Sequence, residues 1–168
     1  MRLGLLTGAR LDELCSLRCE NVLQSKDGFS IRVVEGKTEN ARRIVPIHPR
    51  GSSIIQRRLG QRGSDWLFSG LTPGGPDKKR SWNVSKAFGR FRQHVGVTAR
   101  RADFHALRHN FAEALEAAGV VRDTRELLMG HKREGVAFVY AKGGGVDLRD
   151  AIMQLDYGAE VMELIGRP

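Results

Sequence analysis

Hydrophobic side chains repeat at helical spacing in several separate segments of the chain. The clearest example covers residues 104–119, where Leu107, Phe111 and Leu115 lie four residues apart and share one stripe of a helix that Gly119 ends. Most of the chain is therefore expected to be helical. Similar patterns predict further helices over residues 2–7, 12–18, 51–60, 81–95, 123–129 and from residue 147 onward.

Two shorter segments are rich in β-forming residues. They are FSIRVV (29–34) and RIVPI (43–47), and the polar connection between them contains Gly36. This arrangement predicts an antiparallel hairpin with a polar loop. An extended piece at 66–69 and a loop rich in Gly and Pro at 70–79 complete the pattern. The predicted fold class is mainly α with a small antiparallel β-sheet (α+β).

Two of the predicted helices carry more specific expectations. Asp12 is the expected N-cap of its helix, and Leu14 and Leu17 are expected to face the core. The helix that starts at Asp147 is amphipathic, and its apolar stripe can dock either on the chain's own core or on a neighbouring subunit. The members of that stripe are Leu148, Ile152 and Leu155.

Composition is ordinary for a globular protein. The chain has 168 residues, of which 40% are hydrophobic and 28% are charged, so it can form one domain with a sizeable core. No apolar run approaches the ~18 residues that a membrane span needs. Cys15 and Cys19 lie four residues apart on a predicted helix, which suits reduced thiols in a cytoplasmic protein and makes a poor zinc site.

Positive charge changes this picture. A net charge of +9 favours a polyanionic partner, and nucleic acid is the commonest one. Residues 78–101 contain eight Lys or Arg and no acidic residue, with Trp82, Phe88 and Phe91 among them. We expect the aromatic side chains to anchor this helix to the core and the basic ones to bind phosphates, with a merely solvated basic face as the alternative. The candidate DNA-binding residues are Lys78, Lys79, Arg80, Lys86, Arg90 and Arg92.

Several polar residues are candidates for a reactive site. His105 and Arg108 lie three residues apart, which puts them side by side on one predicted helix. Taken alone, each candidate has an ordinary explanation, such as a surface residue, a helix end or a core aromatic. The other candidates are Arg10, Glu13, Lys37, His131 and Tyr140.

Together these residue types fit chemistry at a phosphodiester. Two arginines can bind the oxygens of one phosphate through paired, charge-assisted hydrogen bonds. Histidines can donate to the same phosphate or move protons near neutral pH, and a tyrosine hydroxyl can attack phosphorus. A lysine can protonate the departing 5′ oxygen. We expect no metal or other cofactor, because cationic side chains can neutralise the transition state and no carboxylate cluster suits a two-metal nuclease.

Four motifs follow one another along the chain. LLTGARLDELCSLRCENV (5–22) has an arginine after Thr-Gly and a glutamate three positions later, and GKTENARRIVPI (36–47) has Lys-Thr before a strand. HALRHNF (105–111) contains His-x-x-Arg, and LLMGHKREGVAFVY (127–140) has Gly-His nine positions before a tyrosine. In this order the motifs resemble those of the tyrosine recombinases, also called phage-type integrases, and the resemblance covers about residues 2–157.

The resemblance implies roles in DNA strand cleavage for four residues. Tyr140 would be the nucleophile, Arg10 and Arg108 would bind the scissile phosphate, and Lys37 would be the general acid for the 5′ hydroxyl. The enzyme would cleave and rejoin strands by transesterification through a 3′-phosphotyrosine, without metal or ATP. The alternatives are a type IB topoisomerase-like enzyme and a basic DNA-binding module whose catalysis is lost.

Supporting roles are implied for three more residues. His105 would assist proton movement at the tyrosine, His131 would hydrogen-bond the phosphate, and Glu13 would orient an arginine or its helix. Two similar residues are weaker candidates. Tyr157 lacks a Gly-His at the right distance, and His109 is expected to be a neighbour of His105 on the helix surface.

The resemblance also implies an architecture and partners. The whole chain, 1–168, would be a single catalytic domain with a C-terminal tail at 143–168, separated from the N-terminal domain that family members carry. Its sequence opens inside a predicted helix, which suggests that the natural protein continues upstream. KGGG (142–145) predicts a mobile nucleophile segment. The expected partners are double-stranded DNA, further copies of the chain (a tetramer in the synapse) and accessory DNA-bending proteins, but no membrane.

One departure from the family pattern points to a branch of the family. The segment between His131 and Tyr140 lacks the Ser/Thr-rich linker that many members have. It resembles the prophage-integrase branch, which implies a mobile element acting in the bacterial cytoplasm at the nucleoid.

Overall fold

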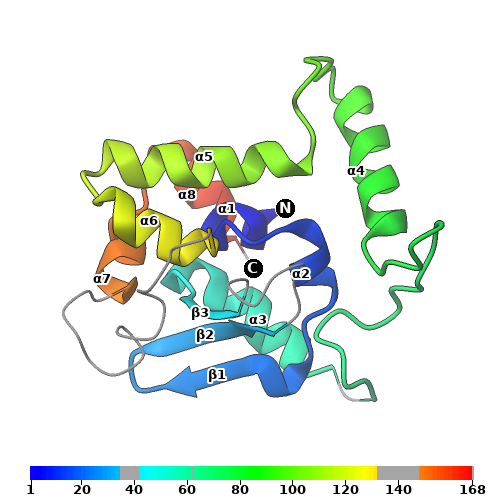
Figure 1. Cartoon of the computed structure of the whole chain (residues 1–168), viewed down its shortest axis with the longest axis horizontal. Helices are drawn as coiled ribbons and strands as arrows, with labels where there is room; N and C mark the ends of the chain where they lie inside the picture. Colours follow the sequence, from blue (N-terminus) through cyan, green and yellow to red (C-terminus); the bar gives the residue numbers. More distant parts are fainter. Residues whose placement is uncertain (35–41, 62, 132–147, 168) are drawn as a thin grey trace.

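The computed structural model describes residues 1–34, 42–61, 63–131 and 148–167 (Figure 1). Helices predominate, and a small antiparallel sheet lies at one side, so the predicted fold class is confirmed. The strands are β1 (Val22–Ser25), β2 (Gly28–Val33) and β3 (Arg43–Pro46), and two 3-10 turns are η1 (Cys19–Asn21) and η3 (Pro49–Gly51). The helices are α1 (Arg2–Thr7), α2 (Leu11–Cys15), α3 (Ser52–Leu59), α4 (Trp82–His94), α5 (Phe104–Ala117), α6 (Arg122–Met129), α7 (Leu148–Met153) and α8 (Ala159–Gly166).

The sheet has the order β1-β2-β3, and both strand pairs are antiparallel. Ile31 in the central strand lies opposite Val22 on one side and Val45 on the other. The pairing of β2 with β3 confirms the predicted hairpin. The sequence pattern does not predict β1, because this edge strand is half-buried or exposed along its length and lacks a clear alternation of apolar and polar residues.

The core lies between the sheet and α5. In Figure 1, α5 runs across the molecule above the sheet, and α1 lies between them. Helix α1 packs against α5, and α3 packs against β2. The stripe predicted for α5 is confirmed for Phe111 and Leu115, which are fully buried, and Leu107 packs partly buried against the same core. Helix α5 therefore forms one wall of the core and carries its polar residues on the remaining faces.

Helix α2 differs from the prediction at both ends. Leu14 and Leu17 are buried as expected. The N-cap position is Arg10 rather than Asp12, whose carboxylate instead accepts a hydrogen bond from the Ser81 hydroxyl at 2.8 Å. The helix ends at Cys15 rather than residue 18, because the next residues turn away to pair with residues 65–67.

Helix α4 is held less tightly than predicted. None of its residues, all of which the structure describes, is fully buried. Phe88 packs against the core and meets Phe104 edge to face, with ring centroids 5.5 Å apart. Phe91 is exposed, and Trp82 is partly exposed, packing on the turn at Gly74 and Gly75. The expectation that all three aromatic residues anchor α4 to the core is therefore wrong for Phe91 and holds only in part for Trp82.

The C-terminal helices pack on the chain's own core. Ile152 and Leu155 of the predicted stripe are fully buried, Leu148 is partly buried, and α7 lies against β3 and α6. Helix α8 was not predicted, and it buries Met162 and Ile165 beside η3. The apolar stripe therefore docks on the chain's own core and not on a neighbouring subunit. Among the described residues, no helix combines the length and apolar character of a membrane span.

Gly8 allows the tight turn between α1 and α2. Its φ is +60°, and a Cβ at this position would lie 2.4 Å from the ring of Phe111. We predict that Gly8→Ala lowers the free energy of unfolding by about 3 kcal/mol, because backbone strain adds to overpacking. Urea denaturation measures the change.

Gly119→Ala is the matched control for this prediction. Gly119 also has a positive φ, of +79°, but the position of its Cβ is open. This variant should lose only the backbone contribution, about 1 kcal/mol. Equal losses at the two positions would contradict the role given to the contact between Gly8 and Phe111.

Candidate active site

The start of α2 is organised by the buried carboxylate of Glu13. Its Oε2 accepts a hydrogen bond from the backbone N–H of Arg10 at 2.8 Å, and its Oε1 accepts one from Arg10 Nη1 at 2.8 Å. Glu13 occupies the third helical position, where a glutamate commonly reaches back to the N-cap backbone. One side chain thus fixes both the helix start and the guanidinium of Arg10.

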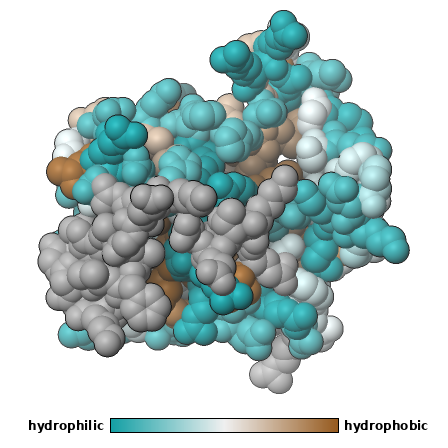
Figure 2. Space-filling model, in the orientation of Figure 1, coloured by the Kyte–Doolittle hydropathy of each residue, from teal (hydrophilic) through white to brown (hydrophobic). Residues whose placement is uncertain are grey.

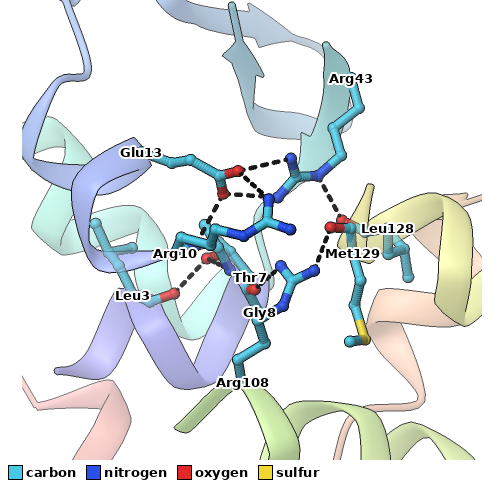
Figure 3. A network of polar contacts seen from close by, with 10 residues as sticks. Leu3, Thr7, Gly8, Arg10, Glu13, Arg43, Arg108, Leu128 and Met129 are labelled. Atoms are coloured by element: carbon cyan, nitrogen blue, oxygen red, sulfur yellow. Dashed lines mark hydrogen bonds and ion pairs between the residues drawn. The ribbon is translucent and has the colours of Figure 1, made fainter. Parts of the chain in front are cut away.

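A second arginine approaches the same carboxylate from the sheet. Arg43 begins β3 and donates from Nη1 to Glu13 Oε1 at 3.2 Å and from Nη2 to Glu13 Oε2 at 2.9 Å. Its Nε also donates to the carbonyl of Leu128 in α6 at 2.8 Å. Figure 3 shows the carboxylate of Glu13 facing the guanidinium groups of both Arg10 and Arg43. The carboxylate is therefore shared by two cations.

Arg108 is a buried cation held by backbone oxygens. Its side chain leaves α5 and donates from Nη1 to the carbonyl of Gly8 at 2.6 Å and from Nη2 to that of Met129 (Figure 3). The residue is only 2% exposed. These two hydrogen bonds fix its guanidinium against the turn after α1 and the end of α6. The pKa of Arg108 is lowered to about 10 by burial, and then by the positive charges of Arg10 and Arg43.

The three arginines and Glu13 form a cluster with an excess of positive charge. Burial alone would raise the pKa of Glu13, but the hydrogen bonds and charges of Arg43 and Arg10 outweigh it and lower the pKa below its ordinary value of 4.5. The carboxylate is therefore ionised at neutral pH, and the cluster carries two net positive charges. Arg10 is its accessible member, because 44% of its side chain is exposed and Glu13 and Arg43 are nearly buried.

Both candidate histidines lie within the field of this cluster. Burial, followed by the positive charges of Arg108 and Arg10, lowers the pKa of His131, which comes directly after α6 and its end at Gly130. Burial, followed by the neighbouring His109 and Arg108, lowers the pKa of His105. Both imidazoles are therefore neutral near pH 7 and can accept or pass on a proton.

An open cleft adjoins the exposed guanidinium of Arg10. Its volume is about 280 Å³, and it lies between the start of α2, the start of α4 and the first turn of α5. Its lining includes Arg10, His105 and Arg108 together with four other polar residues, which are Asp12, Ser81, Ser85 and Asp103. Glu13 and Arg43 do not line it, which agrees with their burial. The cleft therefore leads to the exposed guanidinium of Arg10 and to His105, and the nearly buried Arg108 lies in its wall.

Two predicted site residues, Lys37 and Tyr140, lie outside the described residues, and so does the glycine-rich segment at 142–145. The other tyrosine, Tyr157, is a poor nucleophile in this structure. Its hydroxyl donates to the carbonyl of Leu5 at 2.7 Å, and burial raises its pKa. His109 lies against His105 with ring centroids 4.9 Å apart, as expected for a neighbour on the helix surface.

The six basic candidates differ in how accessible their charges are. Arg80 is engaged by the protein: it donates to the carbonyls of Cys15 and Phe68, and its guanidinium lies 4.1 Å from the ring centre of Trp66. Arg92 donates to the carbonyl of Ala99 at 2.6 Å. The accessible basic side chains around α4 are Lys78, Lys79, Lys86 and Arg90.

The site contains one residue that the sequence analysis did not single out. Arg43 precedes Val45 by two positions in β3, so the two side chains share a face of the sheet, and Val45 is fully buried. An arginine on a buried face needs a partner, because an isolated charge in the core is very unfavourable. The alternation of side chains along β3 was therefore the sequence signal that could have identified Arg43. Among the described residues, no group of three or more His, Cys, Asp or Glu could hold a metal ion.

The sequence model of the phage integrase family matches residues 1–143. The chain belongs to this family. Tyrosine recombinase XerA of Pyrococcus horikoshii is 33% identical over 151 residues, which are 86% of this chain and 50% of XerA. The chain thus spans about half the length of the curated relatives it matches.

Solved structures of integrases share the fold. The integrase from mycobacterium phage Brujita superposes with a TM-score of 0.64 at 22% identity, over 99% of this chain and 55% of that one. The Tn1549 transposon integrase, solved in complex with a circular intermediate DNA, superposes with a TM-score of 0.54 at 22% identity, over 91% of this chain and 56% of that one. The family assignment confirms the resemblance that the motifs indicated.

Glu13 gives the cluster a testable pH dependence. Because its pKa is lowered in the folded state, the stabilisation it provides is complete above about pH 4.5 and is lost as the pH falls through the folded-state pKa. We predict that Glu13→Gln lowers the free energy of unfolding at pH 7 by about 2 to 3 kcal/mol, because the buried guanidinium of Arg43 loses its counter-charge and the partly exposed Arg10 loses an ion pair. Urea denaturation of both proteins between pH 3 and pH 7 measures the difference.

The difference should shrink below pH 4.5, where the wild-type carboxyl also becomes neutral. Glu20→Gln serves as the control, because Glu20 is an exposed glutamate and its neutralisation should change stability by less than about 0.5 kcal/mol. A difference between wild type and Glu13→Gln that stays constant across this pH range would mean that Glu13 does not act through its charge.

Proposed function

We propose that the chain is the catalytic domain of a site-specific DNA recombinase or integrase. The observation that carries the proposal is the joining of motifs far apart in sequence at one cationic cluster. Arg10, Arg108 and the neutral histidines adjoin one another there, beside an open cleft. An excess of fixed positive charge in a partly buried site is suited to binding a phosphodiester and stabilising the charge that develops during its cleavage.

The proposed reaction is a transesterification at phosphorus. The hydroxyl oxygen of Tyr140 attacks the phosphorus and forms a 3′-phosphotyrosine, and the bond to the 5′ oxygen breaks. His105 receives the tyrosine proton, and Lys37 supplies the proton that the 5′ oxygen takes up. Arg10, Arg108 and His131 hold the phosphate oxygens. A 5′ hydroxyl from another strand then reverses these steps, so the phosphodiester bond is re-formed without ATP.

DNA is the proposed substrate and partner. Family membership and the net charge of +9 support this choice. Figure 2 shows hydrophilic side chains over α4, and the exposed basic residues in and next to this helix include Lys79, Lys86 and Arg90. We further propose that strand exchange requires several copies of the chain on DNA, a tetramer in the synapse, together with an N-terminal DNA-binding domain. We also propose that accessory DNA-bending proteins take part and that the chain belongs to a mobile genetic element acting in the bacterial cytoplasm.

The nucleophile assignment is tested with a nicked DNA substrate whose short 5′-hydroxyl product dissociates. We predict that the wild-type chain accumulates a covalent adduct with DNA and that Tyr140→Phe forms none, because the attacking oxygen is missing. Adduct formation is followed on denaturing gels.

The second tyrosine supplies the matched control. Tyr157→Phe removes a hydroxyl that donates to Leu5, so it should lose about 1 kcal/mol of stability and keep adduct formation. An adduct formed by Tyr140→Phe would exclude this tyrosine as the nucleophile. Normal DNA binding without an adduct in the wild-type chain would support a silent DNA-binding module instead.

The α4 surface is tested by the salt dependence of DNA binding. We predict that changing both Lys86 and Arg90 to Gln weakens binding to DNA of any sequence and lowers the slope of log K against log salt by about 2, because two phosphate contacts are lost. The slope is measured by fluorescence anisotropy at salt concentrations between about 50 and 200 mM.

The control for this prediction removes the same charge elsewhere. Lys26 and Arg32 are exposed residues of the sheet region, and changing both to Gln should leave the slope nearly unchanged. Equal effects of the two double variants would show that net charge matters but the α4 surface does not.

A further inference from the structure

Arg43 is the buried hub of the cluster. It contacts both oxygens of Glu13 in α2 and the carbonyl of Leu128 in α6, while its own backbone belongs to β3. One guanidinium therefore joins three elements that are far apart in the sequence. Arg43 does not line the cleft, whereas Arg10 and Arg108 do, and only 7% of its side chain is exposed. It is therefore poorly placed to touch a ligand there.

The end of α6 is shaped around this guanidinium. Gly130 has a φ of +67°, and a Cβ there would lie 2.8 Å from Arg43 Nη1. The backbone next to His131 therefore lies directly against Arg43. In addition, the hydrogen bond from Arg43 to Leu128 and that from Arg108 to Met129 hold adjacent carbonyls. Together these contacts fix the direction in which the chain leaves α6 at His131.

The charge of Glu13 is divided between two arginines. Its oxygens accept two hydrogen bonds from Arg43 and two from Arg10, one of which comes from the Arg10 backbone. If Arg43 were absent, the full carboxylate charge would face Arg10 alone. The guanidinium of Arg10 would then be largely neutralised, and the net charge of the cluster would fall from two positive charges to one.

We propose that Arg43 is a positioning residue for phosphate binding: it offsets the charge of Glu13, so that Arg10 stays available to an anion, and it fixes the end of α6 before His131. Arg43 itself does not contact the phosphate. The inference deepens the proposed function, and it rests on that function only in taking the natural anion to be a DNA phosphodiester.

Inorganic phosphate is the probe, because its binding does not require cleavage of DNA. The ring resonances of His131 and His105 report binding to the 168-residue chain in NMR titrations. Arg43→Gln should weaken phosphate binding roughly tenfold, the effect of one unit charge a few ångströms away in a partly solvated site. Arg32→Gln, which removes an exposed arginine from the neighbouring strand β2, should bind phosphate like the wild type. Equal affinities of the two variants would overturn the proposal.

A double variant separates the charge effect from damage to the fold. Glu13→Gln combined with Arg43→Gln again has two net positive charges and leaves no buried carboxylate without its partner. It should bind phosphate several-fold more tightly than Arg43→Gln alone. A double variant that binds no better than the single one would show that Arg43 serves only to hold the fold, and would overturn the proposal. Thermal unfolding identifies any variant that fails to fold.

DNA cleavage gives an independent measurement. At saturating nicked DNA, Arg43→Gln should form the covalent adduct at least tenfold more slowly, with a smaller change in the DNA concentration needed for half-maximal rate, because contacts to the rest of the DNA are unchanged. Arg43→Lys restores the charge, so it should recover part of the rate. If the wild-type chain forms no adduct, the proposed function fails, and the phosphate titrations still decide the role of Arg43.

Discussion

The buried carboxylate of Glu13 is the constraint on which the rest of the site depends. It starts α2 by accepting the N–H of Arg10, and it brings an arginine of the sheet and an arginine of the helix start to within hydrogen-bond distance of itself. Without a negative charge at this point, the repulsion between the neighbouring guanidinium groups would not be offset by an acid. The single acid is thus what allows the site to hold a stable excess of positive charge.

Arg108 solves the same problem in another way. Its charge is compensated by the partial charges of two carbonyls, those of Gly8 and Met129, rather than by an acid. Both carbonyls lie at the ends of short helices, where backbone oxygens lack helical partners and the helix dipole favours a cation. The two hydrogen bonds that its guanidinium makes with Gly8 and Met129 both go to backbone oxygens rather than to a carboxylate. The left-handed turn at Gly8 presents its carbonyl, which links the tight contact with Phe111 to the site.

The sequence predicted what strong local signals encode. The sequence pattern predicts the stripe of α5 and the hairpin of β2 and β3. The sequence motifs also indicate Arg10, Glu13 and Arg108. Features that depend on tertiary contacts are not predicted, and these are β1, α8, the early end of α2 and Arg43. Helix α2 illustrates the reason, because its favourable pattern continues to Leu17 but pairing with residues 65–67 competes with the last turn. Helix propensity is weak compared with such contacts.

Helix α4 is loosely attached to the rest of the chain, because none of its residues, all of them described by the structure, is fully buried. An apolar hollow of about 390 Å³ is lined mainly by residues of α1, α2 and α3, and Val84 of α4 and Phe104 of α5 also contribute to its lining. Phe88 of α4 packs against the core and meets Phe104 at the start of α5. The same first turn of α5 carries His105. The position of the basic helix and the geometry of the cleft are therefore coupled through this aromatic pair and through the hydrogen bond from Ser81 to Asp12, because Phe104, Ser81 and Asp12 all line the cleft.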